Sequence, residues 1–174
     1  KQAIIHRSWQ NENPESQLEH NERLEFLGDA VLELIVTEYL YGHYSNPEGD
    51  LTNWRAALVN YQNLAQVGAD LDLNVFLMLS KGESKDTGRA RQVILANTME
   101  ALIGAIYLDQ GYKPAQKFIK EKILVGLDYI IKNKLYKDAK SLFQEQSQEK
   151  FGITPTYKVL DENGPDHDKV FTVG

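Results

Sequence analysis

The 174-residue sequence contains no cysteine, which excludes disulfide bonds, thiolate chemistry and cysteine-ligated zinc and fits a reducing, cytoplasmic setting. It has no run of about 18 uncharged apolar residues, so no transmembrane helix and no membrane partner are expected. The first ten residues, KQAIIHRSWQ, lack the basic-then-apolar pattern of a secretory signal. They read as part of an amphipathic helix, so we expect the native protein to begin earlier. With 42% hydrophobic and 25% charged residues, the chain has the composition of a globular protein with a core.

Positive charge is outnumbered by negative charge: the chain has 19 Lys and Arg residues against 25 Asp and Glu residues, a formal net charge of −6. Taken alone, this value argues against a polyanionic partner. The distribution is uneven, however: residues 111–140 contain eight lysines and three acidic residues, a local excess of +5, which leaves −11 for the remainder. This segregation is compatible with a solvated helix face. That is the more common reason, but the segregation can also indicate an acidic site for cations beside a basic surface for phosphates.

Apolar residues recur with helical spacing from residue 1 to about residue 134. Asn21 stands where an N-cap is expected before a long helix. No internal repeat or low-complexity run is present. The predicted helices cover residues 1–9, 22 to about 42, 51–71, 93–111 and 113–135, with a loop rich in glycine and charge at 81–92. We therefore predict a mainly α protein whose first domain, residues 1–136, is an all-helical bundle.

The pattern changes near residue 138. Residues 138–152 form one amphipathic helical segment, and residues 154–173 contain two alternating β segments around a Gly-Pro turn. One helix and two strands are too few for a comfortable independent domain. We therefore expect residues 137–174 to be the α-β-β start of a small α+β domain whose remainder lies beyond this chain.

Four carboxylates stand in one otherwise apolar helical segment. They lie at offsets 0, 3, 7 and 11, which places them on nearly one helix face: Glu22, Glu25, Asp29 and Glu33. Unpaired carboxylates beside a core cost several kcal/mol unless they are protonated, ion-paired or bound to a cation. Acids at this spacing also form ordinary solvated stripes, so spacing alone leaves both interpretations open.

A second apolar helix offers Asn97 and Glu100, again three residues apart. Gly28 and Gly104 lie inside the two helices although glycine costs roughly 1 kcal/mol relative to alanine there. Such glycines favour a close approach of helices, which would bring the two polar sets together. Clustered oxygen ligands without His or Cys suit Mg²⁺ or Mn²⁺. The sequence thus indicates a divalent-metal site between these helices.

The segment NERLEFLGD, residues 21–29, resembles the signature of the ribonuclease III family and matches it without a gap. HRS at 6–8, EGD at 48–50 and LANTMEALIGAIYLDQG at 95–111 follow in the order and spacing of the family's endonuclease domain. The tail with GPDHDKVFTV is similar to the start of the double-stranded-RNA-binding domain of bacterial members. The resemblance covers essentially the whole chain.

The resemblance implies a Mg²⁺-dependent endoribonuclease, with Mn²⁺ as a substitute and no small-molecule cofactor. Such an enzyme hydrolyses phosphodiester bonds of double-stranded RNA to 5′-phosphate and 3′-hydroxyl ends, acts as a homodimer, and processes ribosomal or messenger RNA. By position, the implied catalytic residues are Glu22, Glu25, Asp29, Asn97 and Glu100, and the implied metal ligands are Glu25, Asp29, Asn97 and Glu100. Glu48 matches an acid of the cleavage valley. Phe26 matches an aromatic residue that enters the partner subunit, although by itself it could equally be a core residue.

Asn97 departs from the family pattern, in which most members have Asp. An amide oxygen can still bind Mg²⁺, but the site loses one negative charge and one base. Three explanations remain: natural variation with activity retained, a catalytically impaired protein that acts by binding duplex RNA or as a scaffold, and a deliberate substitution. Because the other acids are all present, a working enzyme is favoured.

The resemblance also implies RNA contacts outside the acidic site. By position, these are Ser141, Gln144, Glu145 and Gln148 on a helix and His167 in the following turn. Each is also an ordinary residue of a solvated helix face or a turn. In the charged loop and just beyond it, the candidates for contact with the RNA backbone are Lys81, Lys85, Arg89 and Arg91, for which a mobile solvated loop is the alternative.

Overall fold

The computed structural model describes residues 1–137, 139–164 and 169–174, without the side chains of residues 139, 141, 142 and 145. The chain forms two compact units, Lys1–Tyr136 and Lys137–Gly174. In these described ranges, no helix combines the length and apolar character that crossing a membrane requires.

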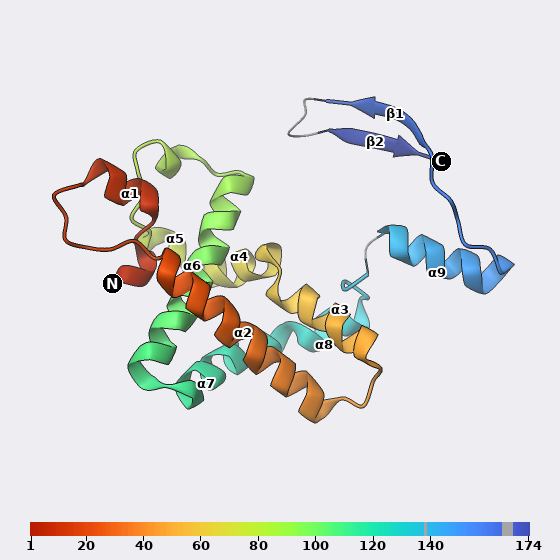
Figure 1. Ribbon diagram of the computed structural model, residues 1–174, viewed down its shortest axis with the longest axis horizontal. Helices are drawn as coiled ribbons and strands as arrows, with labels where there is room; N and C mark the ends of the chain where they lie inside the picture. Colours follow the sequence, from red (N-terminus) through yellow and green to blue (C-terminus); the bar gives the residue numbers. More distant parts are fainter. Residues whose placement is uncertain (138, 165–168) are drawn as a thin grey trace. The chain divides into compact units, whose positions relative to one another are not determined.

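The first unit is entirely helical apart from one isolated β-bridge. Its α-helices are α1 (Arg7–Glu12), α2 (Glu22–His43), α3 (Glu48–Val59), α4 (Tyr61–Asp70), α5 (Leu73–Phe76), α6 (Arg89–Gln110), α7 (Tyr112–Lys122) and α8 (Leu127–Lys132) (Figure 1). Three short 3₁₀ helices complete it: Gln2–Ile4, Glu83–Lys85 and Leu124–Gly126. The predicted fold class, mainly α with a short β tail, is confirmed.

The N-terminal segment differs from its prediction. The expected helix over residues 1–9 is interrupted at Ile5, which is extended, fully buried and paired in a parallel bridge with Met78. Asn21 precedes α2 as predicted but does not cap it. Its buried side chain instead donates a hydrogen bond to the carbonyl oxygen of Ala3 at 3.1 Å. Tertiary pairing therefore replaces local helix formation here.

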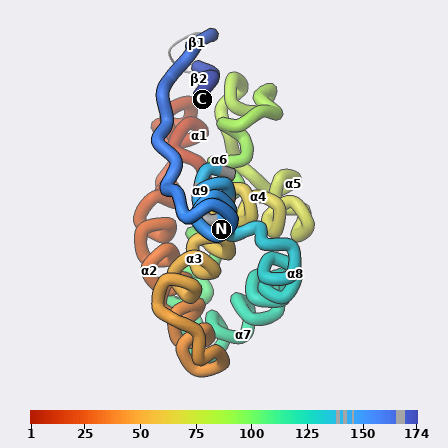
Figure 2. The backbone as a smooth tube through the Cα atoms, turned by 90° about the vertical axis from the view of Figure 1, so that its right-hand side faces the viewer, coloured from red at the N-terminus to blue at the C-terminus, as the bar shows by residue number. Residues whose placement is uncertain are grey.

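Two predicted helices are each divided. The segment 51–71 breaks at Asn60, whose extended backbone ends α3 and whose side-chain oxygen accepts from the N–H of Asn63 at 2.9 Å, capping α4. The segment 113–135 breaks at residues 123–126 between α7 and α8. Both breaks turn the chain, so that α4 packs on α6 and α8 packs on α3 (Figure 2).

Helices α2 and α6 form the centre of the core. Leu32 and Val36 of α2 and Met99 and Ile103 of α6 are fully buried, and α3, α4 and α7 pack around them. The two helices touch through their main chains at glycines. A Cβ atom on Gly28 would collide with the carbonyl oxygen of Glu100, and one on Gly104 would collide with that of Leu24.

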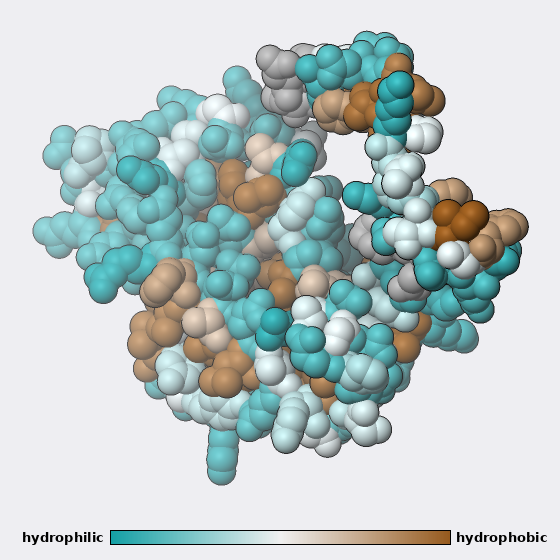
Figure 3. All heavy atoms as spheres, turned by 45° about the vertical axis from the view of Figure 1, so that its right-hand side comes forward, coloured by the Kyte–Doolittle hydropathy of each residue, from teal (hydrophilic) through white to brown (hydrophobic). Residues whose placement is uncertain are grey.

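The second unit contains α9 (Ala139–Phe151), β1 (Val159–Asn163) and β2 (Val170–Val173). The strands pair antiparallel, with Val159 opposite Val173 and Asn163 opposite Val170. Apolar residues of this unit stay at the surface, among them Phe171 on the hairpin. Brown, hydrophobic side chains are visible at the surface of the hairpin in Figure 3. The assignment of this unit to an RNA-binding domain stays a prediction.

Candidate active site

The contact between α2 and α6 determines where the acidic side chains lie. Gly28 of α2 rests on the main chain of Glu100, so the two acids nearest to Gly28 in sequence, Glu25 and Asp29, lie beside Glu100. Asn97 is one turn earlier on α6 and its side chain hydrogen-bonds to Glu25. The close approach predicted from the two glycines is therefore present, and it brings these four polar side chains together.

The electrostatic properties of this inner group show how close its carboxylates are. The pKa of Glu100 rises from its ordinary 4.5 to about 7, first because of burial and then because of the charges of Asp29 and Glu25. Burial also raises the pKa of Glu25, as do Glu22 and Asp29, whereas the hydrogen bond from Asn97 lowers it. These carboxylates repel one another, and a cation between them would relieve the repulsion.

The donor set suits a hard divalent cation, because it consists of carboxylate and amide oxygens without sulfur or imidazole. In residues 1–137, 139–164 and 169–174, no three acidic or histidine side chains are already arranged around one cation position. The amide of Asn97 is engaged with Glu25 instead. The residues fit Mg²⁺ or Mn²⁺ by the chemistry of their donor atoms, and their role as ligands stays a prediction.

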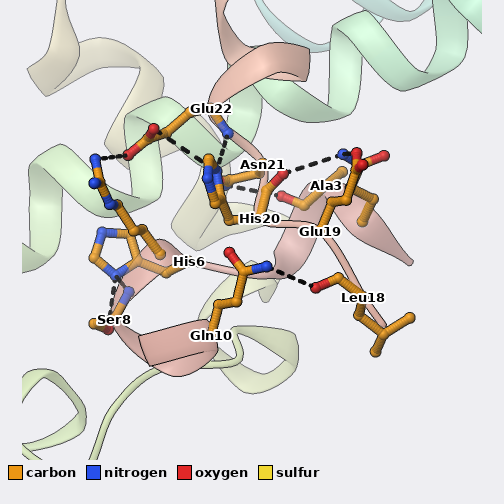
Figure 4. Close-up of polar contacts among 11 residues, drawn as sticks. Ala3, His6, Ser8, Gln10, Leu18, Glu19, His20, Asn21 and Glu22 are labelled. Carbon is orange, nitrogen blue, oxygen red and sulfur yellow. Dashed lines mark hydrogen bonds and ion pairs between the residues drawn. The ribbon is translucent and has the colours of Figure 1, made fainter. Parts of the chain in front are cut away.

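The outer acids of α2 have partners. Glu22 lies 3.4 Å from the guanidinium of Arg7 and 3.7 Å from Nδ1 of His20 (Figure 4). One turn beyond Asp29, Glu33 lies 3.1 Å from Nε of Arg55 on α3. The stripe of four acids seen in the sequence is therefore two inner acids facing α6 and two outer acids with arginine counter-ions. Spacing on one helix could not indicate these arginines, which come from other elements.

Two further predicted residues lie at the surface of the first unit. Glu48 stands in the first turn of α3 and accepts a hydrogen bond from the Thr52 hydroxyl at 2.9 Å. It lines a hollow of about 440 Å³ together with Tyr41 and Arg55. Phe26 is 83% exposed, which excludes the core alternative within one subunit, and it lines another hollow of about 620 Å³.

The predicted RNA contacts on the tail are described in part. Gln144 and Gln148 are exposed on α9, and the side-chain oxygen of Gln148 accepts from Thr154 at 2.8 Å. The side chains of Ser141 and Glu145, and the whole of His167, lie outside the described residues.

The basic residues of the loop 81–92 fall into two kinds. Lys81 and Lys85 are exposed. Arg89 instead lies over the ring of Tyr61 on α4 at 5.7 Å, and Nε of Arg91 donates to the side chain of Asn74 at 3.0 Å. The two arginines thus fasten the start of α6, which is a structural role that the charge pattern did not reveal.

Comparison with known proteins agrees with this architecture. The sequence model of a family described as ribonuclease-III-like matches residues 1–127. The chain is 45% identical to "Ribonuclease 3" of Desulforamulus reducens over 99% of this chain and 71% of that protein. It is 43% identical to "Ribonuclease 3" of Fusobacterium nucleatum over 99% and 74%, respectively.

Solved structures give the same result. The nuclease domain of ribonuclease III from Campylobacter jejuni superimposes with a TM-score of 0.63 at 40% identity, covering 70% of this chain and 82% of that one. Dicer from Pichia stipitis superimposes with a TM-score of 0.53 at 26% identity, covering 89% and 74%. The helical core, the acidic side chains gathered at the α2–α6 crossing and these relatives lead to one conclusion: the chain belongs to the ribonuclease III family and is a ribonuclease III-type endonuclease.

Proposed function

We propose that the protein cuts double-stranded RNA by divalent-metal-dependent hydrolysis and leaves 5′-phosphate and 3′-hydroxyl ends. The observation that carries this proposal is the inner group at the α2–α6 crossing. There, burial of Glu100, and after it the charges of the neighbouring Asp29 and Glu25, raise the pKa of Glu100 to about 7. Such a concentration of unpaired negative charge is costly unless it serves to bind a cation.

Glu25, Asp29, Asn97 and Glu100 would hold the ion, with Mg²⁺ as the natural choice and Mn²⁺ as a substitute. When bound, the ion supplies positive charge against the scissile phosphate and makes a neighbouring water more acidic. In the reaction, water oxygen bonds to phosphorus, the bond from phosphorus to the 3′-oxygen breaks, and that oxygen takes up a proton. Glu100 must be ionised to act as a ligand, so its proton has to leave as the ion binds.

Asn97 is compatible with a working site. Its side-chain amide donates to the carboxylate of Glu25 and lowers the pKa of that group. An ionised Asp at this position could not donate this bond and would add a further negative charge to the inner group. Asn97 therefore offsets part of the rise in the pKa of Glu25 that burial, Glu22 and Asp29 cause, although the site offers one charge fewer to a cation. Together with the presence of Glu25, Asp29 and Glu100, this favours an active enzyme over a protein that merely binds RNA.

Homodimer formation would place two such sites across one duplex, so that each site cuts one strand. Phe26 supports this proposal. It is 83% exposed beside a hollow of about 620 Å³ that is also lined by Leu27 and Leu108. Polar residues, among them Glu19 and Arg23, line the rest of this hollow. A largely exposed Phe beside a hollow with a partly apolar wall would be self-complementary across a two-fold axis. The relative from Campylobacter jejuni is described as having a region involved in dimer formation.

Duplex RNA would be recognised by its shape and phosphates rather than by its bases. We propose Glu48 as an acid lining the cleavage valley. As the minor-groove contacts we propose residues 141, 144, 145 and 148 of α9 and His167 of the turn predicted between the two β segments. Processing of ribosomal and messenger RNA in the cytoplasm would be its cellular role.

The test is cleavage of a long RNA duplex by purified protein with and without Mg²⁺. We expect short products with Mg²⁺ or Mn²⁺ and none with EDTA. Asn97→Asp should cut at least as fast, because it restores the missing charge. Glu100→Ala should lose activity by about a hundredfold or more while still binding duplex. Duplex binding without products in both metals would leave RNA binding or a scaffold as the function.

A further inference from the structure

The acids along α2 differ in whether a positive charge stands beside them. Glu22 at the start of the helix and Glu33 three turns later both have arginine partners, at 3.4 Å and 3.1 Å. Among the described ion pairs, neither Glu25 nor Asp29, which lie between them, has one. The paired acids thus bracket the unpaired ones.

At the first end, Arg7 comes from α1, which follows a segment that is held to the start of α2 by hydrogen bonds from Asn21 to the carbonyl oxygens of Ile5 and Ala3. Its side chain remains 63% exposed and that of Glu22 47% exposed, so the pair faces solvent. Glu22 acts on the inner group, because its charge is the largest Coulombic contribution that raises the pKa of Glu25. A positive charge on Arg7 opposes that contribution.

At the other end, Arg55 is fixed by two contacts. Its Nε pairs with Glu33, and its Nη1 donates to the hydroxyl of Thr37 at 3.0 Å, one further turn along α2. The side chains of Arg55 and Glu33 are 34% and 41% exposed. Two anchors on α2, one and two turns beyond Asp29, hold this guanidinium in place.

We propose that Arg7 and Arg55 are positioning residues that set the net charge of the cleavage site, and so its affinity for divalent cations. This inference rests on the proposed function. By neutralising Glu22 and Glu33, the two arginines leave the inner carboxylates as the charge that attracts a cation. The site thereby gains enough attraction for a cation without so much negative charge that an RNA phosphate is repelled.

The expected size follows from Coulomb's law. A charge of one unit at roughly 8 Å from a divalent ion, in a medium of effective dielectric constant about 60, changes the affinity of that ion by about tenfold. Screening by salt reduces the effect. Removal of either arginine should therefore tighten cation binding about three- to tenfold, and removal of its acid should weaken binding to a similar extent.

In the experiment, Mn²⁺ is titrated into the full chain without RNA, and calorimetry measures the Mn²⁺ affinity. Arg7→Gln and Arg55→Gln should bind Mn²⁺ about three- to tenfold more tightly than the parent. Glu33→Gln should bind it more weakly, and the paired variants R7Q/E22Q and R55Q/E33Q should return to within about twofold. Substituting the arginine and substituting its acid should therefore change the Mn²⁺ affinity in opposite directions. If the ion pair had a purely structural role, both substitutions would change the affinity in the same direction.

Controls separate the possible failures. Arg7→Lys and Arg55→Lys keep the charge and should behave as the parent. Lys117→Gln breaks the exposed ion pair with Glu121 on α7, and should leave Mn²⁺ affinity unchanged.

If the parent takes up no Mn²⁺, the proposed function itself fails. If the parent binds Mn²⁺ and Glu100→Ala does not, while both arginine variants fold and keep the parental affinity, this inference alone is overturned. If Arg55→Gln fails to fold, Glu33→Gln tests the inference for the Arg55–Glu33 pair: weaker Mn²⁺ binding supports it, and unchanged or tighter binding overturns it.

Discussion

The two compact units use their apolar side chains in opposite ways. In Lys1–Tyr136, the apolar faces of α2 and α6 are fully buried against the surrounding helices. In Lys137–Gly174, residues such as Phe151, Leu160 and Phe171 are more than half exposed. The difference shows that the stability of the chain and the proposed catalytic group both depend on the first unit. A two-stranded sheet with uncovered apolar residues contributes little stability by itself.

The largest effect is expected from Gly28→Ala, which tests how far the stability of the chain depends on the core of the first unit. The new methyl group would meet the carbonyl oxygen of Glu100, which is main chain and cannot turn aside. We expect the free energy of unfolding to fall by about 3 kcal/mol or more. The matched control is Gly42→Ala on the same helix, where a Cβ meets nothing within 4 Å. That variant should be as stable or more stable by about 0.5 kcal/mol. Denaturant unfolding of both variants measures the difference, and equal values would refute the importance of this contact.

Phe26 is one of several apolar residues of the first unit that stay outside its core, and it is 83% exposed. If the proposed dimer covers it, Phe26→Ala should weaken self-association by about 2 kcal/mol, which is roughly thirtyfold in the dissociation constant. Sedimentation analysis over a range of protein concentrations measures this constant. The control is Phe76→Ala on α5, another exposed Phe, at 57%. If both variants associate as the parent does, Phe26 is not at the interface.

Glu100 should make the stability of the first unit depend on pH, because its carboxyl group is partly buried in the packed core. Its pKa is about 7 in the folded protein and near 4.5 when unfolded, so the folded state retains a proton that the unfolded state releases between these values. The free energy of unfolding of the metal-free protein should therefore fall as pH rises from about 4.5 to above 7, by roughly 1–2 kcal/mol after allowance for solvent screening.

The measurement is urea unfolding in EDTA at pH 5 and pH 8. Glu100→Gln should remove most of this dependence, and Mg²⁺ should restore stability to the parent at pH 8. A parent protein that is equally stable at both pH values, or a Glu100→Gln variant with unchanged dependence, would contradict the assignment.

The smallest effect is expected from removal of residues 137–174. Since the core of the first unit consists of its own buried residues, the free energy of unfolding should change by less than about 0.5 kcal/mol. Affinity for duplex RNA should fall by less than about tenfold, because the two strands and one helix supply few phosphate contacts. A large loss of stability, measured by thermal unfolding, would show that the two units depend on each other.

The sequence predicted the central helices and the meeting of Gly28 with α6, because helical periodicity and mid-helix glycines are local signals. It could not predict the interruption at Ile5, which follows from pairing with Met78 far along the chain. Nor could it show which of the four acids on α2 have partners. Spacing places residues on one face of a helix, but Arg7 and Arg55 reach that face from α1 and α3, and their contacts depend on the packing of whole elements.

The contact between Gly28 and the carbonyl of Glu100 has a practical consequence for protein engineering. Main-chain atoms set the separation of the two helices there, so the separation does not depend on the side chains that carry oxygen donors. Donors at Asp29, Asn97 and Glu100 can therefore be exchanged while the frame that carries them keeps its dimensions. If the proposed metal site is present, the crossing is a fixed frame on which a preference for a softer or larger ion could be built.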